Sequence, residues 1–124
     1  MRRIRVAVAT AVGVAVLSAP MAGDAAATGA GRLGPCGAGQ LCLWPKSDFR
    51  GERSTSELAG IDIESCVTLP AGTSAASLAN RTGRPVTTYQ SATCGETGEF
   101  GTYPSGSWVP ESAYAVRAYK VWER

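Results

Sequence analysis

Four cysteines in a short chain restrict the fold more than any other feature of this sequence. They lie at Cys36, Cys42, Cys66 and Cys94 of 124 residues. An even number of cysteines in a protein that leaves the cytoplasm indicates two disulfides, and four cysteines allow three pairings. A zinc site with four thiolates is disfavoured, because the chain lacks the close Cys-x2-Cys pairs that such sites use. We therefore expect a small domain held by two disulfides.

The N-terminus has the pattern of an export signal. Residues 1–5 are basic, residues 6–19 form an apolar run of fourteen residues, and Ala25-Ala26-Ala27 supplies a small-residue cleavage pattern. The run is shorter than the roughly 20 residues that a transmembrane helix needs, which argues against an uncleaved membrane anchor. We predict a signal peptide over residues 1–27, cleavage near Ala27, and a secreted, extracellular protein with no membrane contact afterwards.

Cleavage would leave a chain with balanced charge. Arg2, Arg3 and Arg5 are three of the twelve basic residues and Asp24 is one of the ten acidic residues, so nine of each sign remain. No basic stripe is left to hold a phosphate backbone, and we expect no nucleic-acid partner. The remaining 97 residues suffice for one domain with a modest core, which we expect to be a monomer.

The composition of the segments predicts an all-β domain. Short β-branched, apolar and aromatic stretches alternate with turn signals every eight to twelve residues, which is typical of a sandwich or barrel. Residues 28–35 are rich in Gly and Ala and are expected to be a flexible leader to a domain of residues 36–124. The predicted strands are residues 40–45, 66–69, 75–80, 86–89, 99–103, 108–110 and 114–122, of which the last is the longest.

A corner and a weak repeat indicate how the strands are arranged. Gly51 follows the first strand and can take a positive φ where the chain folds back. Residues 41–49 and 86–94 share a strand, an aromatic and a closing apolar residue, and Leu69-Pro70 and Val109-Pro110 recur forty residues apart. Two Greek keys packed face to face would explain this repeat, because neither half buries enough apolar surface alone.

The residue types argue against catalysis. The chain has no histidine, which removes the commonest general base, the Ser-His-Asp and Cys-His arrangements and His-based metal sites. The carboxylate pairs Glu96/Glu99 and Asp62/Glu64 lie in polar loops or turns, where solvated surface charge is the simpler interpretation. No glycine-rich phosphate loop follows a strand and opens a helix. We expect neither an enzyme nor a cofactor.

Two further patterns permit binding hypotheses. Asn80-Arg81-Thr82 fits a glycosylation sequon but also turn chemistry. The aromatic residues could form a sugar-stacking face, although we expect them to fill the core and the strand corners instead. These aromatic residues are Trp44, Tyr89, Phe100, Tyr103, Trp108, Tyr114, Tyr119 and Trp122.

Residues 36–42 and residues 69–82 resemble two segments of the secreted actinobacterial peptidase inhibitors related to the Streptomyces metalloproteinase inhibitor. Cys36-Gly37-Ala38-Gly39-Gln40-Leu41-Cys42 is similar to the first disulfide ring of that family. Leu69-Pro70-Ala71 through Ser77-Leu78-Ala79-Asn80-Arg81-Thr82 is similar to its Leu-Pro-Ala…Ser-x-Ala-Asn-x-Thr stretch. In addition, the spacing Trp44-x4-Phe49-x-Gly51 resembles the folded hairpin that opens a βγ-crystallin Greek key.

The family resemblance covers most of residues 36–90 and implies a fold and a function. The implied fold is a small, disulfide-stabilised, βγ-crystallin-like sandwich of two Greek-key motifs. The implied function is stoichiometric occlusion of the active site of an extracellular peptidase, of metallo or serine type. The competing hypotheses are a non-inhibitory secreted structural or carbohydrate-binding module, and a secreted hydrolase with carboxylates recruited to a cleft.

The resemblance also implies a disulfide pairing and bears on metal binding. Cys36–Cys42 is local and matches the family's ring, which leaves Cys66–Cys94 to close a loop of 29 residues. Many βγ-crystallin domains bind calcium through acidic or amide residues beside a Ser/Thr-Ser pair. The comparable stretch here, residues 73–78, has no acidic residue, and we expect no metal site.

The chain departs from the family where the inhibitory loop is expected. In the family's characterised inhibitor, a second small disulfide ring rigidifies the loop that enters the peptidase, whereas this chain has a single cysteine there. The candidate inhibitory loop is residues 92–98, and an ordinary connecting loop is the alternative interpretation. Residues 104–108 form a second candidate because of their exposed turn chemistry. The central residues of the first candidate are Thr93, Cys94, Gly95 and Glu96.

Overall fold

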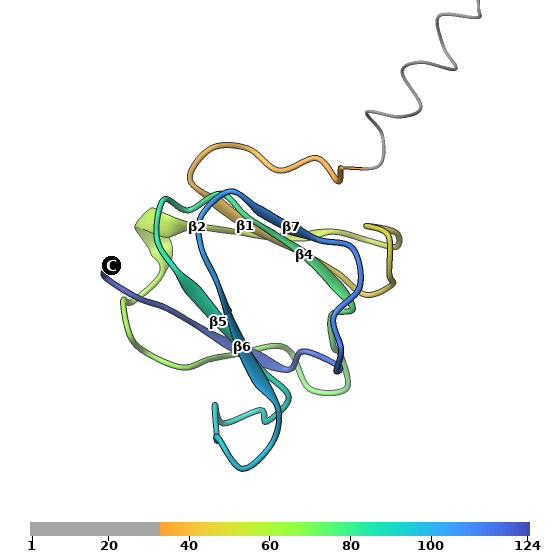
Figure 1. Cartoon of the computed structure of the whole chain (residues 1–124), viewed down its shortest axis with the longest axis vertical. Coiled ribbons are helices and arrows are strands. Elements are labelled where there is room, and N and C mark those ends of the chain that lie inside the picture. The colour runs from red at the N-terminus through yellow and green to blue at the C-terminus, as the bar shows by residue number, and fades with distance from the viewer. Residues whose placement is uncertain (1–32) are drawn as a thin grey trace, which may run out of the picture. The chain divides into compact units, whose positions relative to one another are not determined.

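The structure, a computed structural model, describes residues 33–124 as an all-β domain. The predicted signal peptide and its cleavage site lie outside the described residues. Eight strands form two four-stranded antiparallel sheets that face each other (Figure 1), which confirms the predicted fold class. Among residues 33–124, no helix has the length and apolar character that crossing a membrane requires. The elements are β1 (Gln40–Trp44), β2 (Ser54–Glu57), the 3-10 turn η2 (Leu58–Gly60), β3 (Val67–Thr68), β4 (Ser77–Asn80), β5 (Val86–Tyr89), β6 (Phe100–Tyr103), β7 (Ser107–Val109) and β8 (Ala118–Val121).

The two halves of the domain exchange a strand. The first sheet has the order β2-β1-β4-β7 and the second the order β3-β8-β5-β6. The first half of the domain contains β1 to β4 and the second half β5 to β8. In the first sheet β1 lies between β2 and β4, and in the second sheet β5 lies between β6 and β8 in the same way. The remaining strand of each half pairs in the sheet of the other half, β3 with β8 and β7 with β4. The first sequence echo falls on the equivalent strands β1 and β5, whereas in the second echo Leu69-Pro70 follows β3 and Val109 ends β7. Because each sheet needs a strand from the other half, neither half completes its sheet alone.

The core lies between the two sheets and is formed by the strand side chains that point inward, which are every second residue along each strand. Leu41 and Leu43 of β1 point to the same side and pack with Leu78, Val86 and residues of β8. Cys42 and Trp44 point to the other side of β1 and form a separate buried cluster with Ala79. β1, one of the two central strands of the first sheet, is therefore buried on both faces.

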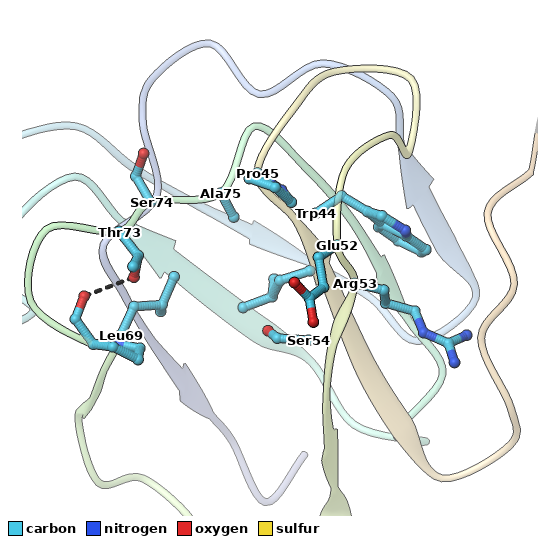
Figure 2. Close-up of a pocket in the computed structure, with 11 residues that line it drawn as sticks. Trp44, Pro45, Glu52, Arg53, Ser54, Leu69, Thr73, Ser74 and Ala75 are labelled. Atoms are coloured by element: carbon cyan, nitrogen blue, oxygen red, sulfur yellow. Dashed lines mark hydrogen bonds between the residues drawn. The ribbon is translucent and has the colours of Figure 1, made fainter.

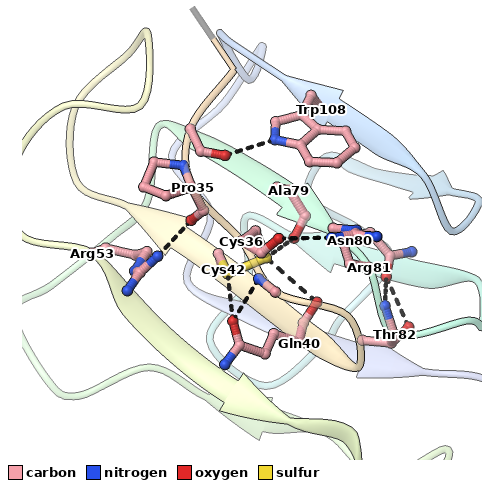
Figure 3. The surroundings of a disulfide bond; sticks show 12 residues. Pro35, Cys36, Gln40, Cys42, Arg53, Ala79, Asn80, Arg81, Thr82 and Trp108 are labelled. Atoms are coloured by element: carbon pink, nitrogen blue, oxygen red, sulfur yellow. Dashed lines mark hydrogen bonds between the residues drawn. A yellow bond between two sulfur atoms is a disulfide. The ribbon is translucent and has the colours of Figure 1, made fainter. Parts of the chain in front are cut away.

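An N-terminal segment, residues 33–39, covers the outer face of the first sheet (Figure 3). Its backbone carbonyls accept hydrogen bonds from three long side chains. Trp108 Nε1 donates to the Gly34 carbonyl at 2.9 Å, Arg53 donates to the Pro35 carbonyl at 2.6 Å, and Arg81 donates to the Cys36 carbonyl at 3.1 Å. Gly34 is buried, and a Cβ there would lie 2.6 Å from the Trp44 ring. Gly34 and Pro35, which lie inside the segment predicted as a leader, are therefore held by distant side chains that bond their carbonyls.

The corner after β1 is fixed by a buried hydroxyl. Asp48 and Phe49 both have φ of 58°, and Gly51 has φ of 91°, which confirms the positive φ predicted for that glycine. Ser77 has no exposed surface; its Oγ donates to the Lys46 carbonyl at 2.6 Å and accepts from the Phe49 N–H at 3.0 Å. These two bonds satisfy the backbone of a turn that strand pairing cannot reach.

The sequon asparagine is interior rather than a modification site. Asn80 is fully buried, and its Nδ2 donates to the carbonyls of Arg84 (2.8 Å) and Tyr103 (3.1 Å). Its Oδ1 accepts from the backbone N–H of Thr82 at 3.1 Å and from its hydroxyl at 2.8 Å. The turn interpretation of this motif is therefore confirmed. The Ser77 to Thr82 stretch that carries the family resemblance is structural.

The prediction of one long final strand is wrong. Only Ala118–Val121 is a strand, and Val116 makes an isolated bridge with Ala75. The Ser112 N–H donates to the Ala76 carbonyl, whereas the Arg117 N–H donates to Tyr89 in the second sheet. The segment therefore passes from one sheet to the other, which prevents continuous pairing despite its alternating pattern.

We predict that Gly51→Ala destabilises the domain by about 1–3 kcal/mol, because the new Cβ would occupy a positive-φ position. That Cβ would also lie 2.6 Å from Pro45 Cγ. Urea unfolding of both proteins measures the difference. Gly60→Ala is the matched control, since a Cβ there meets no atom within 4 Å. Equal losses in the two variants would contradict this assignment of strain.

Candidate functional site

The connection between β5 and β6, residues 90–99, is the most prominent loop of the second sheet. In Figure 1 it extends beyond the ends of the two strands it joins. The Gln90 N–H donates to the Glu99 carbonyl at 2.8 Å, and the Glu99 N–H donates to Gln90 Oε1 at 3.2 Å. The neck of this β5–β6 loop is therefore closed, and the residues between form a separate projection.

The base of the β5–β6 loop is tied to β3. The disulfide Cys66–Cys94 joins it to the residue before β3, with a Cα–Cα distance of 6.0 Å, and the Thr68 hydroxyl donates to the Ala92 carbonyl at 2.6 Å. Cys94 is 9% exposed and packs with Tyr89 and Ala118. Both predicted disulfides are present, since Cys36 and Cys42 are also bridged. A covalent bond and a hydrogen bond thus hold the loop from one side.

The tip of the β5–β6 loop is free. Glu96 and Thr97 are exposed, and none of the described residues forms a hydrogen bond with residues 95–98. Residues 90–103 contain two carboxylates, Glu96 and Glu99, and no Lys or Arg, so the projection is anionic. A fixed base with an unpaired tip suits insertion into the groove of a partner rather than catalysis within this chain.

The four residues predicted for this site lie on the one loop but differ in position. Thr93 is exposed, with its N–H donating to Ser91 Oγ at 3.2 Å, whereas Cys94 is buried and adopts a φ of 58°. Gly95 is half-buried beside Ser91. Thr93 and Glu96 can therefore contact a partner directly, while Cys94 supports the loop.

The sequence interpretation missed the residue next to the loop. Phe100 was expected to fill the core or a corner, but it is 48% exposed at the start of β6. Trp44, Tyr89 and Tyr119 are at most 4% exposed and do fill the interior, so a sugar-stacking face containing them does not form. The alternation in residues 99–103 could have indicated an outward Phe100, but not that it lies on an edge strand.

The second candidate, residues 104–108, is bound to the rest of the domain. The Gly106 N–H donates to the Asn80 carbonyl at 2.6 Å, and Ser105 Oγ accepts from the Gly83 N–H at 2.8 Å. The Trp108 indole donates to Gly34. This turn follows the end of β6 opposite to the β5–β6 loop, so the two candidates do not form one site.

A pocket of about 280 Å³ opens between the β1–β2 corner and the segment after β3 (Figure 2). Its walls are mainly apolar, and its charged lining residues are Glu52 and Arg53. Arg53 already donates to the Pro35 carbonyl, and the Thr73 hydroxyl donates to the Pro70 carbonyl at 2.6 Å. Within residues 33–124, no group of three or more His, Cys, Asp or Glu is placed to hold a metal ion. The pocket therefore offers few free polar groups to a ligand.

A comparison with known protein families finds a match. A family model described as peptidase inhibitor family I36 matches residues 29–101, which is more than half of the 124 residues. The chain belongs to peptidase inhibitor family I36. Searches of the curated proteins and of the solved structures find no match.

The I36 match covers one of the two candidate loops and not the other. It includes the Cys36–Cys42 ring, the Ser77 to Thr82 stretch and the whole β5–β6 loop, and it ends at Gly101 within β6. Residues 104–108 lie outside it. Membership in I36 makes a peptidase the expected class of partner.

We predict that removing the long-range bridge lowers the free energy of unfolding by about 3–4 kcal/mol, the chain-entropy value for a loop of 29 residues. The double variant Cys66→Ala/Cys94→Ala tests this by urea unfolding. Limited proteolysis should then cut within residues 91–98 first, because the loop base loses its covalent support. An unchanged unfolding free energy and cleavage pattern would show that the bridge does not support the loop.

We also predict that stability falls as the pH rises above about 10. Burial raises the pKa of Tyr89, and the nearby Glu96 carboxylate raises it further; burial also raises the pKa of Tyr114, outweighing its bond to Thr88. A raised folded-state pKa stabilises the fold below the unfolded value of about 10, and this contribution is lost as the pH rises toward the folded value. Urea unfolding from pH 8 to 11 should show the decline, and Tyr89→Phe should make it shallower. A decline of the same slope in that variant would contradict the role of Tyr89.

Proposed function

We propose that this protein is a secreted inhibitor that blocks an extracellular peptidase by placing the β5–β6 loop in its active-site cleft. The observation that carries the proposal is a loop inside the I36 match with a covalently held base and a free tip. Such a loop occludes a cleft at a stoichiometry of one to one without any chemistry of its own.

The way the loop is held supports this function. Association requires the ordering of flexible segments, and a loop that is already ordered loses less entropy when it binds. This chain has no second local disulfide ring near Cys94, so the bridge to Cys66 and the bond from Thr68 to Ala92 would supply the rigidity. Both contacts come from the β3 side, which leaves the Glu96 side open to a partner.

The remaining expectations fit an inhibitor. The absence of histidine and the exposure of Asp62, Glu64, Glu96 and Glu99 support a protein that is not an enzyme. The strand exchange supports two βγ-crystallin-like Greek keys, since β4 and β8 return beside the first strand of their own half. Export by a signal peptide over residues 1–27, a monomeric state, and no cofactor, metal or nucleic acid complete the proposal.

One observation favours a second candidate function. A loop without a local ring has less covalent restraint than an inhibitory loop commonly needs, which fits a secreted structural or carbohydrate-binding module that does not inhibit. Titration against peptidases separates an inhibitor from a structural or carbohydrate-binding module, because the module would leave the peptidases active.

The test is titration of the oxidised, exported protein against a thermolysin-type metallopeptidase and a subtilisin-type serine peptidase. We expect loss of activity near one equivalent for at least one of them. Thr93→Arg and Glu96→Arg should each raise the inhibition constant about tenfold or more, because both side chains are exposed on the loop that must enter the cleft.

Thr55→Arg is the matched control, since Thr55 is exposed on β2 in the other sheet. It should leave the inhibition constant within about twofold. Full peptidase activity in both titrations, with this protein intact on a gel, would reject inhibition of these two types and favour the second candidate. Inhibition that survives both loop variants would move the site to residues 104–108.

A further inference from the structure

Phe100 is an exposed aromatic ring on a rigid support. Only two large apolar side chains of the described residues are exposed, Leu33 at 56% and Phe100 at 48%. The Phe100 ring stacks on Tyr89, with centroids 6.0 Å apart and an interplanar angle of 27°. Tyr89 is 1% exposed and packs against Cys94 at the loop base. The orientation of the exposed ring is thus set by the same cluster that holds the loop.

The backbone beside this ring is free to pair. The second sheet ends at β6, so one side of that strand has no neighbouring strand among residues 33–124. Directly opposite residues of an antiparallel strand pair alternate between hydrogen-bonded and non-hydrogen-bonded. The Gln90 N–H donates to the Glu99 carbonyl, so this pair is hydrogen-bonded and the Tyr89/Phe100 and Thr87/Thr102 pairs are not. The backbone N–H and C=O groups of Phe100 and Thr102 therefore point away from β5. An unpaired strand edge is a template for an extended segment of a partner, with pockets for alternate side chains.

The edge and the loop form one continuous surface. Phe100 directly follows the closing residue of the loop, Glu99, and the Phe100 and Thr102 side chains lie on the same face of β6. That surface has one large apolar side chain and the carboxylates of Glu96 and Glu99, with no basic residue from 90 to 103. One cation, Lys120 of β8, lies on the same face of the sheet, with its Nζ 5.9 Å from the Tyr89 ring centroid. The complement of that surface is an apolar subsite with a positively charged rim.

We propose that Phe100 and the free edge of β6 form a second contact of the inhibitory surface. Phe100 enters an apolar subsite of the peptidase while an extended strand bordering the cleft pairs with Phe100 and Thr102. This inference rests on the proposed function. It predicts that target peptidases are those with an apolar subsite beside a strand-lined cleft.

The test measures association and dissociation rates of the oxidised protein with whichever peptidase it inhibits. Phe100→Ala should raise the inhibition constant about 30-fold or more, mainly through faster dissociation, as for a buried aromatic anchor. Phe100→Leu should recover most of the affinity. Glu99→Gln should instead slow association and reduce its dependence on salt.

A second variant tests the edge without removing the anchor. Thr102→Pro deletes an N–H that points away from β5, so an edge strand tolerates it while an added strand loses a hydrogen bond. Because it also removes the hydroxyl that bonds Thr87 Oγ1 at 2.6 Å, Thr102→Val serves as the control for that loss. Thr102→Pro should raise the inhibition constant about tenfold. Melting temperatures show whether each variant folds. Leu33→Ala is the matched control, and we expect it to bind as the wild type does.

The outcomes distinguish the two proposals. A folded Phe100→Ala variant that inhibits within threefold of wild type, while Thr93→Arg raises the inhibition constant about tenfold or more, overturns the second contact and keeps the loop. A wild-type protein that inhibits neither type of peptidase overturns both. A Leu33→Ala variant as weak as Phe100→Ala also overturns the second contact, because exposure alone would then explain the loss.

Discussion

The exchange of β3 and β7 between the two halves is the constraint on which the rest of the structure depends. Each sheet is complete only when the opposite half supplies a strand, so the halves must form together. Small domains bury limited apolar surface, and this arrangement lets one core serve both halves. It also places β3 of the first half beside the loop that follows β5 of the second.

The two halves use the same corner position differently. Phe49 lies five residues after Trp44, and Cys94 lies five residues after Tyr89; both have a φ of 58°. In the first half the corner residue packs edge-on to Trp44, with ring centroids 5.1 Å apart. In the second half it is bridged to Cys66 beside β3. A position that closes a corner in one half therefore anchors the proposed inhibitory loop in the other.

The family resemblance and the proposed function depend on different residues. Ser77, Asn80 and Thr82 are buried and satisfy backbone groups at turns, so they identify the scaffold. The exposed residues of the loop, Thr93 and Glu96, hold no part of the core, and their identity is free to suit a partner. Membership in an inhibitor family consequently says more about the fold than about which peptidase is bound.

The sequence by itself determined most of the strand positions, the expectation of two disulfides and the positive φ of Gly51, because these follow from alternation, cysteine number and local sterics. It did not determine β2 or the bounds of β8. Only the tertiary structure decided that the Gly34 carbonyl accepts from the Trp108 indole, that residues 114–117 pass between sheets, and that Phe100 lies on a free edge. Those features depend on which segments distant in sequence become neighbours. A period-two pattern tells which residues share a face, but it does not tell whether a strand has a partner on one side or on both.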